Sequence, residues 1–207
     1  MSSVSLEQAR RRCESADYRP DLHLADAEHL PFPNNTFDIV YSYGVMHHGP
    51  DARQCLKEAR LVLKPGGKAR LLLYHHPTLI GLMLWFRYGA FRGKSLRQAV
   101  YEHLESPGTQ SFTQDEVRSL MQSFDDVEMR LVFSPGDQLL NRPSVRFQSP
   151  VYRVIWGLFP RAVVRRLCGK LGLFLLTSAQ KPIAWKRPIQ SYANPQPDNF
   201  FRDGRAS

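Results

Sequence analysis

The residues best suited to chemistry are an acidic stretch near the N-terminus and two histidine pairs. The acidic stretch, Ala25-Asp26-Ala27-Glu28, closes a short apolar run and is followed by a Pro-Phe-Pro turn. A carboxylate at such a place can accept hydrogen bonds from a bound ligand, or it can cap the turn with its own oxygen. From the residues alone, the turn-capping role is favoured for Asp26.

The two histidine pairs are His47-His48 and His75-His76. Adjacent side chains point in different directions and do not ligate one ion comfortably, and no carboxylate or cysteine lies near His47 at metal spacing. We therefore expect no metal site, while His47 could still line a site of another kind. His75 and His76 follow a predicted strand and are candidates for orienting or deprotonating a substrate, with a plain surface pair as the alternative.

The elements that position these residues alternate as strand, loop, helix, turn and strand. Phe37–Ser42 is a predicted strand, Asp51–Leu63 an amphipathic helix that ends at Lys64-Pro65-Gly66-Gly67, and Lys68–Tyr74 a second strand. This βαβ unit requires a parallel sheet. Ligands bind at the carboxyl ends of such strands, where Tyr41-Ser42-Tyr43-Gly44 lies. Within that run, Tyr41 is predicted to be a core residue.

Further elements are predicted on both sides of this unit. The apolar segment 79–105 is expected to cover the substrate site, which favours a partly apolar substrate. The alternative is a core-facing helix pair, and the two interpretations are compatible. These elements are a helix Val4–Glu14, a short strand Asp21–Ala25, the helix pair Leu79–Phe91 and Ser95–Glu105, a helix from the capping box at Thr113 to about Phe124, a strand Val127–Phe133, an irregular loop Ser134–Pro150, a basic amphipathic helix Val151–Lys170, a last antiparallel strand Leu171–Ser178 and an irregular tail 181–207.

Composition and charge narrow the class of protein. The chain has 207 residues, 43% of them hydrophobic, and three cysteines without a Cys-x-x-Cys pair, which favours one globular α/β domain in a reducing compartment. We see no signal peptide or membrane span and expect a cytoplasmic protein. The net charge of +9 comes from residues 146–207, which hold 11 Lys and Arg against Asp198 and Asp203. This basic segment could contact an anionic membrane or nucleic acid, but a solvated surface is the simpler interpretation.

Four motifs in one order carry a resemblance to a known family. They are Asp26-Ala27-Glu28…Leu30-Pro31-Phe32, Phe37-Asp38…Val40, His47-His48 and Leu61-Val62-Leu63-Lys64-Pro65-Gly66-Gly67. Over residues 4–76 the chain resembles the class I S-adenosylmethionine-dependent methyltransferases, in particular the methyltransferase type 11 group. The resemblance implies a Rossmann-like sheet of order 3-2-1-4-5-7-6 and S-adenosylmethionine as cofactor.

The resemblance also implies roles for single residues. Asp26 would accept a hydrogen bond from the adenine amino group, the amide of Ala27 would meet a ring nitrogen, and Leu30 would form an apolar wall. At the end of the central strand, Gly44 would let the backbone approach the methionine portion of the cofactor, with Ser42 and Tyr43 beside it. Methyl transfer is an in-line displacement that needs alignment more than a fixed base.

Part of the family's pattern has no counterpart in this chain. The family places a first strand, a Gly-rich turn and a second strand ending in an acidic residue before residue 4. We therefore expect a sheet without strands 1 and 2, in which Phe37–Ser42 is an exposed apolar edge open to self-association. The chain could be a fragment of a longer enzyme, which we favour, or could complete its sheet with another chain, or could be a cofactor-free relic.

The predicted function is S-adenosylmethionine-dependent methylation of a small-molecule acceptor by the C-terminal portion of a longer enzyme. Residues 1–180 would form the partial methyltransferase domain. One alternative is a non-catalytic methyltransferase-like partner subunit. The other is an RNA- or DNA-binding protein, which we do not expect because no Asn-Pro-Pro-Tyr/Phe-like motif follows Phe37–Ser42.

Overall fold

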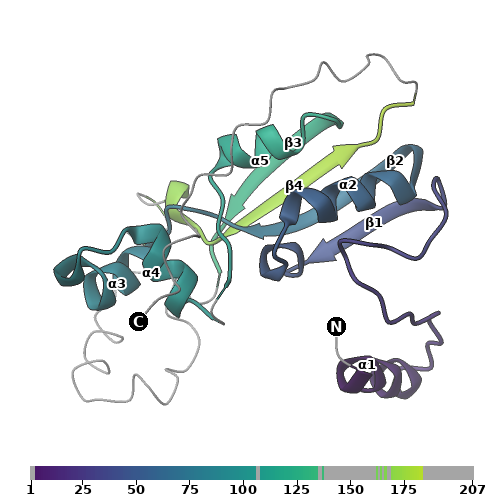
Figure 1. The fold of residues 1–207 in the computed structure, drawn as a ribbon, viewed down its shortest axis with the longest axis horizontal. Helices are drawn as coiled ribbons and strands as arrows, with labels where there is room; N and C mark the ends of the chain where they lie inside the picture. Colours follow the sequence, from purple (N-terminus) through teal and green to yellow (C-terminus); the bar gives the residue numbers. More distant parts are fainter. Residues whose placement is uncertain are drawn as a thin grey trace, which may run out of the picture.

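The computed structural model describes residues 3–105, 108–134, 137, 162, 164, 166 and 169–183. Helices and strands alternate along this part of the chain (Figure 1). The elements are α1 (Ser3–Ser15), β1 (Phe37–Tyr43), the 3-10 turn η1 (Met46–His48), α2 (Ala52–Val62), β2 (Leu63–Tyr74), α3 (Leu79–Tyr88), η2 (Ala90–Arg92), α4 (Leu96–His103), α5 (Gln114–Leu120), β3 (Asp125–Val132), η4 (Gly169–Leu171) and β4 (Phe174–Gln180).

The four strands form one mixed sheet in the order β1-β2-β4-β3. β1 and β2 are parallel, and β4 runs antiparallel to both β2 and β3. This open α/β sheet with an antiparallel last strand confirms the predicted fold class. β1 lies at the edge, where Ile39, Tyr41 and Tyr43 are 60%, 68% and 54% exposed. The expected apolar edge is therefore present.

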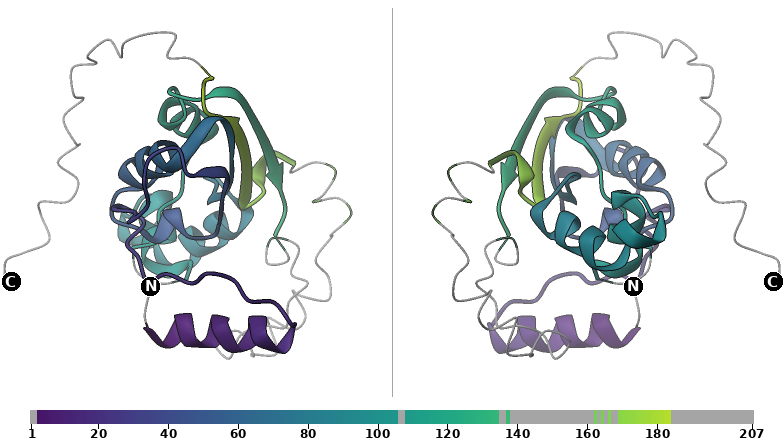
Figure 2. Two further views of the ribbon diagram at one scale, coloured as in Figure 1. Left: turned by 90° about the vertical axis from the view of Figure 1, so that its right-hand side faces the viewer. Right: turned by 90° about the vertical axis from the view of Figure 1, so that its left-hand side faces the viewer.

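Helices α2 and α5 pack on one face of the sheet, and α3 and α4 lie beyond its end (Figures 1 and 2). The main core joins Leu56 and Ala59 of α2 and Val117 of α5 to Leu71 of β2 and Leu175 of β4. On the opposite face, Leu72 and Tyr74 of β2 pack with Ile80 and Leu104 from the helical cover. The cover is thus anchored where β2 ends.

Helix α2 follows the predicted pattern closely. Asp51 is its N-cap, and the carboxylate accepts the backbone N–H of Gln54 at 3.0 Å. The apolar positions Ala52, Leu56 and Ala59 are all buried against the sheet. Because this side chain satisfies an unpaired N–H in the first turn, the helix begins at Ala52, after η1.

The Pro-Gly-Gly turn belongs to strand β2 instead of preceding it. Pairing with β1 is irregular between Phe37 and Ile39, so the turn forms a bulge in the parallel ladder. Gly66 has φ +79°, and its N–H donates to the carbonyl of Lys181 at 2.8 Å. The turn is therefore held between the two neighbouring strands of the sheet.

Four predicted segments differ from the structure or lie mostly outside the described residues. Asp21–Ala25 is not a strand, and an isolated β-bridge next to it joins Asp26 to His29. Among the described residues, no strand lies beside this segment to pair with it. The loop Ser134–Pro150, the basic helix Val151–Lys170 and the tail after residue 183 lie mostly outside the described residues. In the described part of the chain, no helix is long and apolar enough to cross a membrane.

A substitution at Gly67 tests how tightly the bulge is packed. A Cβ there would lie 2.8 Å from the carbonyl oxygen of Lys64 and 3.1 Å from that of Asp38. Because backbone cannot move aside easily, Gly67→Ala should lower the free energy of unfolding by about 1–3 kcal/mol in urea denaturation. Gly169→Ala, where nothing lies within 4 Å, is the control and should change it by less than about 0.5 kcal/mol. Equal effects would contradict the packing described for the bulge.

Candidate functional site

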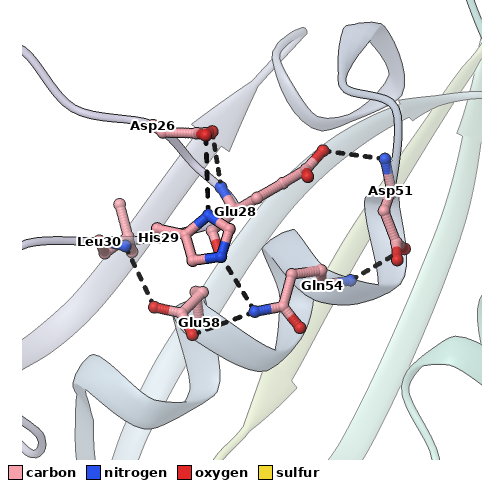
Figure 3. A network of polar contacts seen from close by, with 7 residues as sticks. All are labelled: Asp26, Glu28, His29, Leu30, Asp51, Gln54 and Glu58. Carbon is pink, nitrogen blue, oxygen red and sulfur yellow. Dashed lines mark hydrogen bonds and ion pairs between the residues drawn. The ribbon is translucent and has the colours of Figure 1, made fainter.

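The acidic stretch of residues 26–30 is attached to helix α2 by polar contacts (Figure 3). The carboxylate of Glu28 accepts the backbone N–H of Asp51 at 2.9 Å, and its carbonyl oxygen accepts the side-chain amide of Gln54 at 3.0 Å. The N–H of Leu30 donates to the carboxylate of Glu58 at 3.1 Å. These contacts fix an otherwise irregular segment beside the N-terminus of α2.

Asp26 lies at the exposed end of this segment. Its Oδ1 accepts the N–H of Glu28 at 3.0 Å, and its Oδ2 is 3.7 Å from the Nδ1 of His29 (Figure 3). The side chain remains 67% exposed. One oxygen thus caps the turn, as the residues alone suggested, and the other is open to a further donor.

The end of β1 provides the second half of the candidate site. Ser42 is buried, and Tyr43 is exposed and stacks on Tyr41 with ring centroids 6.0 Å apart. Gly44 has φ +72°, and a Cβ built there would meet nothing within 4 Å. The core position predicted for Tyr41 is wrong, because nothing described covers the face of β1 that carries it. Glycine suits position 44 because the positive φ strains other residues, and its lack of a side chain leaves open space around the backbone.

A polar cluster at the ends of β2 and α4 was not predicted from the sequence. His47 is fully buried and stacks on Tyr74 with ring centroids 3.9 Å apart. The carboxylate of Glu105 accepts the Tyr74 hydroxyl at 2.7 Å and lies 3.3 Å from the Nε2 of His48. The Nδ1 of His48 is 3.3 Å from the hydroxyl of Thr109. Glu105 therefore joins the helical cover to both η1 and β2.

The protonation states in this cluster follow from burial. Burial, and then the neighbouring His48, lowers the pKa of His47 to about 4. Burial, and then the hydrogen bond to Glu105, raises the pKa of Tyr74. At neutral pH His47 is uncharged and Tyr74 keeps its proton, so Tyr74 remains a donor to the Glu105 carboxylate. The cluster can present a carboxylate and a partly exposed imidazole to a substrate.

His75 and His76 are more enclosed than the sequence suggested. The backbone N–H of His75 donates to Leu173 at 2.7 Å, and that of His76 to Phe112 at 2.9 Å. Burial lowers the pKa of both rings, and the Nδ1 of each lacks a hydrogen-bond partner. In the described part of the chain, no side-chain hydrogen bond joins them to the Glu105 cluster, and no group of three His, Cys, Asp or Glu residues could hold a metal ion.

Comparison with known proteins finds a family model that matches the N-terminal part of the chain. Residues 1–71 match the family model described as a methyltransferase domain. The match covers 71 of the 207 residues. A presumed methyltransferase from Bacillus halodurans has a similar structure, with a TM-score of 0.56, 18% identity and coverage of 88% of this chain and 80% of that one. The cyclase SpnF is also similar, with a TM-score of 0.54, 15% identity and coverage of 88% and 65%. These low identities show the fold alone.

Curated methyltransferases match the chain over shorter segments. The 27-O-demethylrifamycin SV methyltransferase of Amycolatopsis mediterranei is 37% identical over 73 residues, which are 34% of this chain and 27% of that protein. The demethylmenaquinone methyltransferase of Bacillus mycoides is 42% identical over 92 residues, which are 42% and 39% of the two chains. The methyltransferase domain segment thus spans well under half the length of these relatives.

The buried imidazole of His47 makes stability depend on pH. Because its pKa is lowered in the folded state, the unfolded chain takes up the proton first, so the free energy of unfolding should fall as pH drops from 6.5 to about 4. The shift corresponds to about 3 kcal/mol. His47→Phe keeps a stacking ring and should remove this part of the slope, measured by urea denaturation at several pH values. His23→Gln, at an exposed pair with Asp21, should keep it. An unchanged slope in His47→Phe would contradict the assignment.

Proposed function

We propose that the chain takes part in S-adenosylmethionine-dependent methylation of a small-molecule acceptor. The observation that carries the proposal is the position of residues 26–30, which are attached to α2 next to the turn that follows β1. Glu28 comes close to that turn, because a Cβ at Gly49 would lie 3.6 Å from its carboxylate. Two segments of the matched family region thus meet at the carboxyl end of a parallel strand, where open α/β sheets bind ligands.

The residues at this place suit the cofactor. Asp26 offers an exposed carboxylate oxygen to the adenine amino group, and the adjacent amide of Ala27 can donate to a ring nitrogen. Leu30 supplies an apolar wall. Gly44, with Ser42 and Tyr43 beside it, leaves room for the methionine portion. When bound, the cofactor supplies a methyl group already activated on a sulfonium, so the chain needs chiefly to hold donor and acceptor in line.

The acceptor side is proposed to include the Glu105 cluster. His48 and Glu105 can hold or accept the proton of an acceptor hydroxyl, while Tyr74 fixes the carboxylate by donating to it. His75 and His76, whose rings are enclosed, are proposed to orient the acceptor. The apolar helical cover favours a partly apolar acceptor. Relatives named for demethylmenaquinone and for 2-methyl-6-phytyl-1,4-hydroquinone support acceptors of this chemistry.

The uncovered edge and face of β1 support a second candidate, a methyltransferase-like partner subunit. Ile39, Tyr41 and Tyr43 place exposed apolar side chains on an unpaired strand. Such an edge can accept a further strand from an extension of the same chain or from another copy. The cyclase SpnF has a similar fold, so this fold also occurs in a protein named for another activity.

Calorimetric titration with S-adenosylhomocysteine distinguishes these candidates. The 207-residue chain and a version extended upstream through its reading frame should be compared, and we expect at least one to bind. In the binding version, Asp26→Ala should weaken binding about tenfold or more, because a hydrogen bond to a charged group contributes about 1.5–3 kcal/mol. Asp21→Ala, on the same irregular segment, is the control. No binding by either version would favour the partner subunit, and equal binding by Asp26→Ala would remove Asp26 from the site.

The acceptor side is tested by methyl-transfer kinetics with a prenylated hydroquinone. His48→Gln should lower kcat by about 10²-fold or more and alter the acid limb of the pH profile, because a positioned general base contributes about 10²–10⁴-fold. His23→Gln is the control and should leave kcat unchanged. If His48→Gln keeps the wild-type kcat and pH profile, the proton-accepting role of this cluster is wrong.

A further inference from the structure

Helix α3 lies at the outer end of the molecule, with α4 packed beside it (Figures 1 and 2). Its inner face is defined by three positions spaced three or four residues apart. A Cβ at Gly81 would lie 3.0 Å from a Val100 methyl group, the indole N–H of Trp85 donates to the carbonyl of Lys94 at 2.8 Å, and the ring of Tyr88 is 4.3 Å from that of His103. These contacts fix the rotation of α3 about its axis.

The opposite side of α3 is apolar and exposed. At 100° per residue, positions 83, 86 and 87 lie on the other side of the helix from 81, 85 and 88. Met83 is 43% exposed and Phe86 63%, and Phe91 in the following turn η2 is 96% exposed. Large apolar side chains exposed to water do not gain the free energy that their burial would give. A grouped set of them marks a contact surface more often than chance exposure does.

Basic residues accompany these apolar side chains. Arg87 and Arg92 are both exposed, and Leu79–Gly93 contains no Asp or Glu. The guanidinium of Arg92 donates to the carbonyl of Tyr88 at 3.3 Å, and that of Arg87 lies 5.2 Å from the Tyr88 ring centroid. Aromatic side chains between cations suit the boundary between acyl chains and anionic headgroups.

We propose that this surface docks on an anionic phospholipid bilayer. We name it the α3 outer face, and it consists of Met83, Phe86, Arg87, Phe91 and Arg92. The aromatic and thioether side chains enter the interfacial layer, while the two guanidinium groups bind lipid phosphates. Because α3 has ten residues, it is too short to cross a bilayer and would lie along the bilayer surface. This inference does not depend on methyl transfer, and it concerns a different segment from the basic residues 146–207.

Vesicle flotation of the full 207-residue chain tests the proposal. The chain should bind vesicles containing phosphatidylglycerol, bind pure phosphatidylcholine vesicles much more weakly, and be released by high salt. Phe86→Ser with Phe91→Ser should weaken binding to anionic vesicles more than tenfold. Arg87→Gln with Arg92→Gln should weaken it and flatten its salt dependence. The control Val4→Ser with Tyr18→Ser removes exposed apolar side chains elsewhere and should bind like wild type.

Circular dichroism of each variant checks that it is folded. We expect wild-type spectra, because the substituted side chains are exposed and the core is unchanged. Three outcomes would overturn the proposal. The chain does not bind anionic vesicles, or the Phe86 and Phe91 double variant binds them as tightly as wild type, which would assign the contact to another segment. In the third, size-exclusion chromatography shows a dimer that the double variant abolishes, so the face is occupied by a second copy.

Discussion

The contact between Glu28 and the first turn of α2 positions the rest of the candidate site. Residues 21–30 contain no helix or long strand, so their place cannot come from a backbone ladder. It comes from Glu28 accepting the Asp51 N–H, and from Gln54 and Glu58 binding the backbone on either side. The same crowding of carboxylates, after burial itself, raises the pKa of the enclosed Cys55 thiol to about 11. Cys55 belongs to the core cluster against which Ala27, next to Asp26, packs.

A second polar group connects the helical cover to the sheet. Glu105, at the end of α4, binds Tyr74 at the end of β2 and lies against His48 in η1. Because these residues come from three elements, the cover and the carboxyl ends of both parallel strands are held at one place. The proposed acceptor site and the proposed membrane face therefore belong to one helical unit, with α4 on the sheet side and α3 outward.

The local elements could be predicted from the sequence because their signals are local. Asp51 and the apolar spacing of α2, the capping box of Thr113 and Glu116, and the apolar run of β1 each specify an element within a few residues. The family resemblance supplied the order of the elements and the candidate residues of the cofactor side, which remain proposals.

What could not be predicted depends on contacts distant in sequence. The sequence predicts a strand at Asp21–Ala25, but the described part of the chain has no strand beside it with which it could pair. Tyr41 reads as core, but its face of β1 is uncovered. The partner of His48 is Glu105, 57 positions later in the numbering, and no short motif indicates such a pair.

Hydrogen exchange with and without S-adenosylhomocysteine tests the central claim most directly. The account predicts slower exchange at amides 27–30, in the segment attached to α2, and at amides 43–45, at the end of β1. If the ligand binds but exchange at both segments is unchanged, the account is contradicted.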